Sequence, residues 1–229
     1  MGQGTTSDEP EVPAGAFSAW LRQMQGALRG EHDSEVRCEG CTACCTASQF
    51  ILIEPDEVTT MARIPPELLF PAPLRPPGHV LLGYDEHGHC PMLIDGACSI
   101  YEDRPRACRA YDCRVLPAAG VDLTEHDKAL LAQRVRRWRF SHPTERDRAE
   151  HDAVRAAAAF LAERGDELPE GSVPASDTQR AVLAIEIHET FLRVHPVDGD
   201  GTGDRAVVIA PDPAAVRVAI SRRVVTPPP

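Results

Sequence analysis

The 229-residue chain is 42% hydrophobic and 26% charged, a composition that can bury a core and that excludes global disorder. Its net charge is −11 and no segment is strongly basic, which disfavours nucleic-acid binding. No apolar run reaches the roughly 18 residues that a membrane span needs, and residues 1–13 lack the apolar core of a signal peptide. We therefore expect a cytoplasmic protein without a membrane partner. The chain has 23 arginines, one lysine and no asparagine, which indicates a GC-rich, bacterial genome.

The first 37 residues predict a polar tail followed by an amphipathic helix over residues 14–29. Apolar side chains recur there at helical spacing, at Phe17, Trp20, Leu21, Met24 and Leu28. The favoured interpretation is a helix docked on the core. Binding of a protein partner is the alternative.

All eight cysteines lie in the next segment, residues 38–116, within a third of the chain. Cys38, Cys41, Cys44 and Cys45 form the pattern C-x2-C-x2-C-C, and the others follow at Cys90, Cys98, Cys108 and Cys113. In a reducing cytosol, clustered cysteines more often bind metal or carry out redox chemistry than form disulfides. Two residues between thiolates let a tight turn direct both sulfurs at one ion or cluster. The sequence therefore predicts a metal-binding module at residues 38–116.

The adjacent pair Cys44 and Cys45 is not expected to serve one site equally. Their side chains point to opposite faces of a strand or diverge by about 100° on a helix. One of them is expected to serve a second site or to pack as a small hydrophobe. Unrelated buried cysteines, or disulfides in an exported protein, are the two other interpretations of the cluster.

Short elements are expected between the cysteines. Gln49–Ile53 and Val80–Tyr84 are predicted strands, the acidic residues at 54–57 begin a helix, and six prolines between residues 65 and 77 predict a stiff loop. Asp95-Gly96 predicts the turn of a β-hairpin, and Pro105 suits the first position of a short helix. Positive charge lowers the pKa of a thiol, so the arginines expected to crowd around Cys108 and Cys113 favour thiolates there. These arginines are Arg104, Arg106, Arg109 and Arg114, and pairing with surface acids is the alternative.

These motifs resemble a known family over roughly residues 36–116. The pattern CxxCxxCC at residues 38–45, followed by C…DGxCSIYxxRPxxCR at residues 90–109, is similar to the zinc- or iron-chelating cysteine-cluster family (YkgJ-like, the CxxCxxCC domain). The resemblance implies a metal-binding module and little about a reaction. Flagellin lysine N-methylases carry a similar cluster within longer chains. Seven cysteines match the pattern, and Cys113 lies just past it.

The spacing leaves the metal open between zinc and an iron–sulfur cluster, because both take four thiolates. Eight thiolates can form two four-ligand sites, or one site with spare cysteines. The run Cys38, Cys41 and Cys44 partly matches the ferredoxin pattern, so an iron–sulfur cluster is slightly preferred to zinc.

Beyond the module, residues 117–165 predict a pair of helices packed against it. Thr124 is expected to cap a helix that runs to about Trp138, with Leu130, Leu131, Val135 and Trp138 inward. The cations Arg134, Arg136, Arg137 and Arg139 suit the end of this helix, and a docking patch for an acidic partner is the alternative. Thr144 is expected to cap the second helix, which stops near Gly165.

Residues 166–229 predict a polar linker over 166–175, a helix capped by Ser176 that contains Phe191, a strand over Ala206–Ala210 and a disordered tail from Thr226. Residues 198–204 begin like a calcium loop, but the twelfth position is Ile209 rather than glutamate. A catalytic role for Glu186, His188 and Glu189 is disfavoured.

The expected fold class is therefore α+β, with a small, irregular, metal-stabilised cysteine module of short strands and a hairpin that several α-helices enclose. The leading functional hypothesis is a cytoplasmic metal-binding protein. The alternatives are an iron–sulfur-dependent redox or protein-modifying enzyme, or a metal-stabilised assembly factor with a protein partner. The sequence does not decide whether the chain is an enzyme, and it does not give the oligomeric state.

Overall fold

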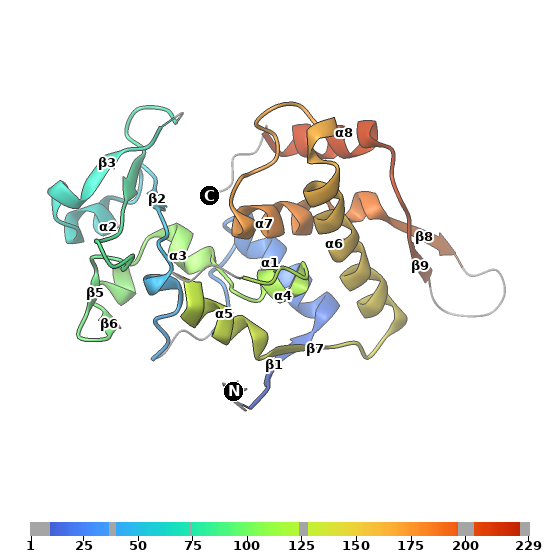
Figure 1. Ribbon diagram of the computed structural model, residues 1–229, viewed down its shortest axis with the longest axis horizontal. Coiled ribbons are helices and arrows are strands. Elements are labelled where there is room, and N and C mark those ends of the chain that lie inside the picture. Colours follow the sequence, from blue (N-terminus) through green and yellow to red (C-terminus); the bar gives the residue numbers. More distant parts are fainter. Residues whose placement is uncertain (1–9, 37–39, 74, 124–127, 197–203, 225–229) are drawn as a thin grey trace, which may run out of the picture.

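The computed structural model describes residues 10–36, 40–73, 75–123, 128–196 and 204–224. Its fold is α+β, as predicted, with eight helices and several two- and three-stranded sheets in these ranges. Figure 1 shows a small module of short strands on one side and a larger helical body on the other, joined through α3 and α5. The cysteine-rich turn lies where the two parts meet.

The module contains a three-stranded antiparallel sheet of order β2-β4-β3 and a hairpin of β5 and β6. Its elements are β2 (Ile51–Ile53), α2 (Val58–Arg63), β3 (Leu69–Pro71), β4 (Val80–Leu82), β5 (Leu93–Ile94), β6 (Ala97–Cys98) and α3 (Arg106–Ala110). Asp95 and Gly96 both have positive φ, +50° and +76°, as the predicted two-residue hairpin turn requires. One face of the sheet packs on a small core of Ile53, Ile64, Leu82, Met92 and Ile100.

The helical body is built around α6 (Glu145–Glu163), which packs on α7 (Asp177–Ile187) and α1 (Phe17–Leu28). Thr144 caps α6 as predicted, in a reciprocal pair of hydrogen bonds with Asp147. The predicted inward residues of α1 are confirmed: Phe17, Trp20, Leu21 and Met24 are buried, and Leu28 packs against the same core. That core also takes up α4 (Val115–Ala118) and α5 (Ala129–Arg136), so it reaches the cysteine segment.

A parallel two-stranded ribbon closes one side of the body. β1 (Val12–Ala16) pairs with β7 (Trp138–Ser141) in the register Val12 with Trp138 and Ala16 with Ser141. Sequence reasoning missed this ribbon. It placed Trp138 at the end of a helix, whereas α5 ends at Arg136 and Trp138 begins the strand.

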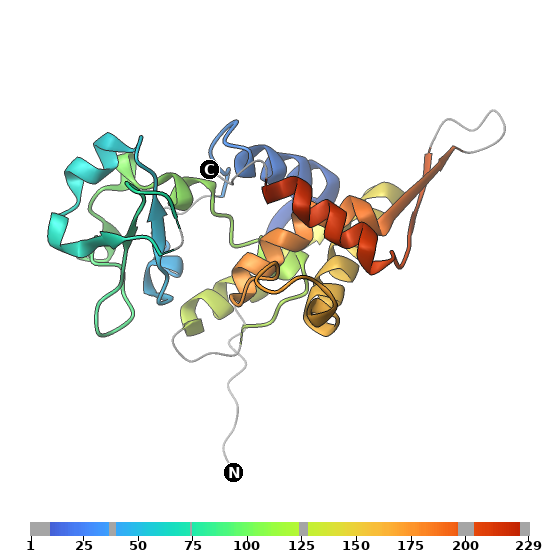
Figure 2. The same ribbon diagram turned by 90° about the horizontal axis from the view of Figure 1, so that it is seen from above.

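The C-terminal part adds a hairpin and a helix to the body. β8 (Leu192–Pro196) and β9 (Asp204–Val208) pair antiparallel and project from the body, as Figure 2 shows, while α8 (Pro213–Val224) packs against α7. β8 and α8 were not predicted. Residues 198–203, where a flexible loop rather than a calcium site was expected, and the tail expected from Thr226 both lie outside the described residues.

Several local predictions are corrected by the structure. The proline-rich stretch 65–77 is not wholly irregular, because Leu69–Pro71 pairs with β4 as an edge strand. Leu130 is exposed rather than inward. Ser176 lies at the start of α7 without a side-chain cap, and Phe191 belongs to a separate short turn after α7. The expected cap Thr124 lies outside the described residues.

The two helices expected as a pair have different neighbours. α5 lies against the turn Cys44–Thr46 and α4, whereas α6 packs chiefly within the helical body. Among the helices described, none is both long enough and apolar enough to cross a membrane.

Candidate metal centre

Three of the cysteines, Cys41, Cys44 and Cys45, lie on one tight turn before β2. The Thr46 hydroxyl stabilises the turn, since it lies within 3.2 Å of two backbone carbonyl oxygens, those of Thr42 and Ala43. Ala43 and Ala47 bury their methyl groups in the main core, which anchors the turn to the helical body. The sulfurs of the turn are thereby held at the boundary between the module and the body.

Cys108 is positioned by α3, whose first turn is held by a buried carboxylate. Glu57 Oε1 accepts the backbone N–H of Arg106 at 2.5 Å, and Glu57 Oε2 accepts that of Glu54 at 2.9 Å. The guanidinium of Arg106 pairs with Glu54 and, at 2.7 Å, with Asp56. These contacts fix the start of α3 beside β2 and place Cys108 one turn further along.

Cys113 is positioned by the residue before it. Asp112 is buried and accepts the indole N–H of Trp20 at 2.9 Å. It also accepts the backbone N–H of Arg114 at 2.9 Å and the guanidinium of Arg114 at 2.6 to 3.0 Å. Arg114 also donates to the carbonyl oxygen of Ala14, at 3.1 Å. A buried carboxylate of this kind needs its partners, because a charge left unpaired in a protein interior is costly. This network holds the chain at Cys113 against α1 and β1.

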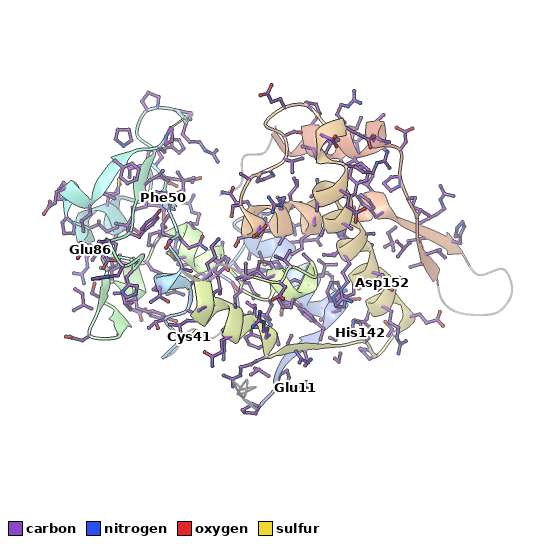
Figure 3. The ribbon with its side chains drawn as sticks, in the orientation of Figure 1. Glu11, Cys41, Phe50, Glu86, His142 and Asp152 are labelled. Atoms are coloured by element: carbon purple, nitrogen blue, oxygen red, sulfur yellow. The ribbon has the colours of Figure 1, made fainter. Side chains whose placement is uncertain are left out.

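Four thiols from these segments line one small cavity of about 30 Å³. Two of them, Cys41 and Cys44, come from the turn, and the other two, Cys108 and Cys113, come from α3 and the start of the α4 segment. The remaining lining residues are Val36, Ala43, Tyr111, Leu131 and Arg134. Figure 3 shows Cys41 at the boundary between the module and the helical body. The fold thus brings together two cysteine pairs that lie more than 60 residues apart in the sequence.

One cavity sulfur receives a hydrogen bond. The indole Nε1 of Trp138 donates to Cys113 Sγ at 3.3 Å, and the guanidinium carbon of Arg134 lies 4.8 Å from the centre of the Trp138 ring. Burial and the nearby Asp112 carboxylate raise the pKa of Cys113 to about 12, against the opposing effects of Trp138 and Arg134. A metal cation bound at this sulfur would displace the proton. The N–H of Trp138 and the charge of Arg134 would then stabilise the thiolate that remains.

The other cavity thiols also hold their protons tightly. Contact with Cys45 and burial raise the pKa of Cys44 far above its ordinary value. Burial, and then the neighbouring cysteines, raise the pKa of Cys108, while the charge of Arg104 lowers it. Because these thiols share a small half-buried space, their ionisation requires a positive charge among them.

A second group of cysteines adjoins the cavity without lining it. The backbone carbonyl oxygen of Cys45 accepts the backbone N–H of Cys90 at 2.7 Å, and Cys98 lies in β6 opposite Leu93. Cys90 and Cys98 pack against the small core of the module. Of the adjacent pair, Cys44 lines the cavity and Cys45 does not, although the two thiols contact each other. The unequal roles expected of the pair as ligands remain a prediction.

All seven described cysteines are free thiols, and Cys38 lies outside the described residues. Within the described ranges, no three cysteine, histidine or acidic side chains are placed so that they could hold a metal ion as they stand. The four thiols therefore line one cavity without converging on a single point. The donor set nevertheless fits a thiophilic metal, because four sulfurs and no carboxylate line the space.

The four arginines expected around Cys108 and Cys113 each have a partner within the chain. Arg109 faces Asp33 at 3.5 Å, and Arg104 donates to the carbonyl oxygen of Tyr101 at 2.7 Å. Arg106 and Arg114 are bound to acids as described above, so three of the four predicted arginines are paired with carboxylates. The fourth, Arg104, lowers the pKa of the cavity thiol Cys108. The charge that sequence reasoning missed near the thiols is Arg134, which was assigned only to a helix end.

The arginines at 134–139, for which a docking patch was the alternative interpretation, are largely bound within the chain. Arg136 pairs with Asp122 at 3.0 Å, Arg139 pairs with Glu11 at 2.8 Å, and Arg137 donates to the carbonyl oxygen of Pro10 at 3.0 Å. These contacts favour a structural role for the arginines over a docking patch.

Comparison with known proteins identifies the cysteine segment. Residues 37–130 match the family model named CxxCxxCC, described as a "Putative zinc- or iron-chelating domain". This segment is similar to the CxxCxxCC domain, and we use that name for residues 37–130. The match covers less than half of the chain, and it extends past the predicted module end at residue 116 into α5. No curated protein and no solved structure matches the chain.

The family description indicates chelation of zinc or iron, and the matched range contains every cysteine of the chain. The match ends at residue 130, within the first turn of α5, so the cavity residues Leu131 and Arg134 lie just beyond it. The cavity therefore draws most of its lining from the CxxCxxCC domain and a smaller part from the helix that follows.

Proposed function

We propose that the CxxCxxCC domain holds one metal centre through the sulfurs of Cys41, Cys44, Cys108 and Cys113. The observation that carries this proposal is the single cavity that these four thiols line. The hydrogen bond from Trp138 to Cys113 supports it, since donors to sulfur stabilise a coordinated thiolate. Cys38, Cys45, Cys90 and Cys98 are then supporting residues or ligands of a further site.

Zinc is the metal that we propose for this cavity. Four sulfurs and no carboxylate line the cavity, a donor set that a single zinc ion can use in full. The four sulfurs come as two close pairs from distant segments, a spacing typical of structural zinc sites with Zn–S distances of about 2.3 Å. Four thiolates fill a tetrahedral coordination shell, so the proposed role is structural: the ion ties the turn before β2 to α3 and α4.

An iron–sulfur cluster is the second candidate, favoured by the C-x2-C-x2-C spacing of Cys38, Cys41 and Cys44. Anaerobic purification separates the two candidates when zinc, iron and acid-labile sulfide are measured per chain beside the visible absorption spectrum. One zinc in a colourless protein is the expected result. Iron with equal sulfide and brown absorption bands would establish the cluster and would make redox or protein-modifying chemistry the next question.

Serine substitutions test the ligand assignment. Cys41→Ser, Cys44→Ser, Cys108→Ser and Cys113→Ser should each lose bound metal. Cys90→Ser and Cys98→Ser are matched controls from the same domain and should keep it. Circular dichroism distinguishes loss of metal from failure to fold, and the controls would overturn the assignment if they lost metal as readily as the cavity variants.

A further inference from the structure

The three-stranded sheet of the CxxCxxCC domain is apolar on both faces. Alternate residues of a strand point to opposite sides, and in the register of this sheet Ile53 and Val80 face the small core together with Leu82. The intervening residues Leu52 and Leu81 lie opposite each other on the other side. An antiparallel sheet with one solvated face normally carries polar side chains on that face. This sheet does not.

Three aromatic rings extend this second face. Phe50, Phe70 and Tyr84 have exposed fractions of 56%, 39% and 40%. The Phe50 ring lies 5.9 Å from the Phe70 ring and 4.9 Å from the Tyr84 ring, measured between centroids. We call this surface the aromatic face and define it by Phe50, Leu52, Phe70, Leu81 and Tyr84.

A glycine allows the rings to lie against the sheet. A Cβ atom at Gly83 would stand 3.2 Å from the Phe70 ring and 3.8 Å from the Phe50 ring. The contact with Phe70 is tight, so a side chain at this position would require the Phe70 ring to move by a few tenths of an ångström, whereas the contact with Phe50 is an ordinary one. The rings are thus held in contact while they remain open to solvent, which is the geometry of a binding platform rather than of a core.

The segment that carries this face has an excess of negative charge, and two of its acidic residues adjoin the face. Residues 38–116 contain eleven acidic residues and six arginines. Asp85 and Glu86 directly follow Tyr84, and the Glu86 side chain is 86% exposed. Asp85 Oδ1 accepts the backbone N–H groups of His87 and His89 at 2.9 and 2.8 Å, and these bonds hold the pKa of Asp85 below its ordinary value. Figure 3 shows Phe50 and Glu86 on the same module.

Aromatic rings beside carboxylates are suited to cations. The electron-rich face of a ring attracts ammonium and guanidinium groups, and a neighbouring carboxylate strengthens that attraction. Bases of a single-stranded nucleic acid also stack on exposed rings, but such proteins add a positively charged groove for the phosphates. The negative charge of this module excludes that arrangement.

We propose that the aromatic face docks a basic segment of another protein, with arginine or lysine side chains over the rings and apolar side chains over Leu52 and Leu81. Such a segment would lie beside the cysteine turn, because Ser48 N donates to Gly88 O at 3.0 Å and ties the loop after Tyr84 to the residues that follow Cys45. The inference does not depend on which metal the domain holds.

Peptide titration of the full-length, metal-loaded protein tests the proposal. The probes are a five-residue peptide of alternating arginine and leucine and its counterpart with glutamate in place of arginine. Binding is followed by the NMR signals of the aromatic rings and leucine methyl groups. The arginine peptide should shift the signals of Phe50, Phe70 and Tyr84 in a saturable manner, whereas the glutamate peptide should not.

Surface variants locate the binding. Phe50→Ser and Phe70→Ser remove exposed rings and should each weaken binding of the arginine peptide by about fivefold or more. Val58→Ser, at a 66% exposed apolar residue of α2 in the same module, is the matched control and should leave binding unchanged.

Three results would overturn the proposal: equal binding of the two peptides, no shift at millimolar peptide, or tighter binding of a short single-stranded oligonucleotide. Sedimentation at increasing protein concentration supplies a fourth. Self-association that Phe50→Ser abolishes would assign the face to a second copy of this chain instead.

Discussion

The hydrogen bond from Trp138 to Cys113 makes a quantitative prediction about metal affinity. Trp138→Phe keeps an aromatic ring at a position that is only 8% exposed and removes the N–H group that lies 3.3 Å from Cys113 Sγ. A hydrogen bond to a charged group contributes about 1.5–3 kcal/mol. That range corresponds to a loss of about tenfold to a hundredfold in the metal association constant, the same size as measured effects of residues that support metal ligands.

The assay is competition for the bound metal with a chromophoric chelator at fixed pH. Trp20→Phe is the control, because it removes the other buried indole N–H, which donates to Asp112 rather than to sulfur, while Arg114 still holds that carboxylate next to Cys113. Both variants should lower the stability of the metal-free chain, so urea unfolding is measured beside the competition. Only Trp138→Phe should weaken metal binding beyond its effect on folding.

Two results would refute this reasoning. Metal affinity of Trp138→Phe within about twofold of the parent would mean that the hydrogen bond is not made to a coordinated thiolate. An equal loss of affinity in Trp20→Phe would mean that general loosening of the core, and not the donor at sulfur, controls the site.

Three further predictions concern the supports of the fold. Burial alone would raise the pKa of Asp147, but hydrogen bonds from Thr144 and Ser18 lower it to about 2. Because the pKa of the unfolded chain is about 3.9, this shift stabilises the folded chain by about 2–3 kcal/mol above pH 4. The stabilisation is lost as the pH falls to 2, and Asp147→Ala should remove that pH dependence in urea unfolding. Burial, Arg155 and His142 lower the pKa of His151 to about 4. The unfolded chain therefore takes up this proton first, stability falls between about pH 6.5 and 4, and His151→Phe should flatten the profile in that window. Glu57→Gln leaves one of two backbone donors without a carboxylate oxygen and should lower the unfolding free energy by about 1–2 kcal/mol, measured by urea titration.

Features with a local cause were predictable from the sequence. The hairpin at Asp95 and Gly96 follows from two residues that tolerate positive φ, and the start of α6 follows from Thr144 and Asp147 three residues later. Each signal lies within a few residues and owes nothing to the rest of the fold. The helix of residues 17–28 was predictable for a similar reason, because its apolar side chains recur at helical spacing.

Features that depend on distant partners were missed or misplaced. β1 and β7 pair across more than 120 residues, and neither segment alternates clearly between apolar and polar residues. Trp138 consequently resembles the inward end of a helix until its strand partner is known. The edge strand β3 was hidden by prolines, which an edge position tolerates because one side of the strand needs no backbone donor.

The candidate site was likewise predictable only in part. The sequence shows that the cysteines are clustered, but it does not show which of them share a cavity. Cys113, the one cysteine beyond the family pattern, lines the cavity, whereas Cys90 and Cys98 within the pattern pack toward the small core. Chain order cannot reveal this selection, because the turn at residues 41–45 and the segment of residues 108–113 meet only in the folded chain, where Asp112 is held by both Arg114 and Trp20.

The position of the cavity explains why a metal would matter to a chain of this size. The module's core consists of only five buried residues, and a core so small supplies little stability by itself. The helical body has two larger cores, and the first of them also takes in Ala43 and Ala47 of the cysteine turn. Metal thiolate bonds between the cysteine turn and the α3–α4 segment would join the two parts at their boundary, and the binding free energy would then stabilise the module. Metal removal should therefore unfold the module before the body, as two separate transitions in thermal unfolding followed by far-ultraviolet circular dichroism. A single transition, shifted as a whole by the chelator, would show instead that the two parts fold as one unit.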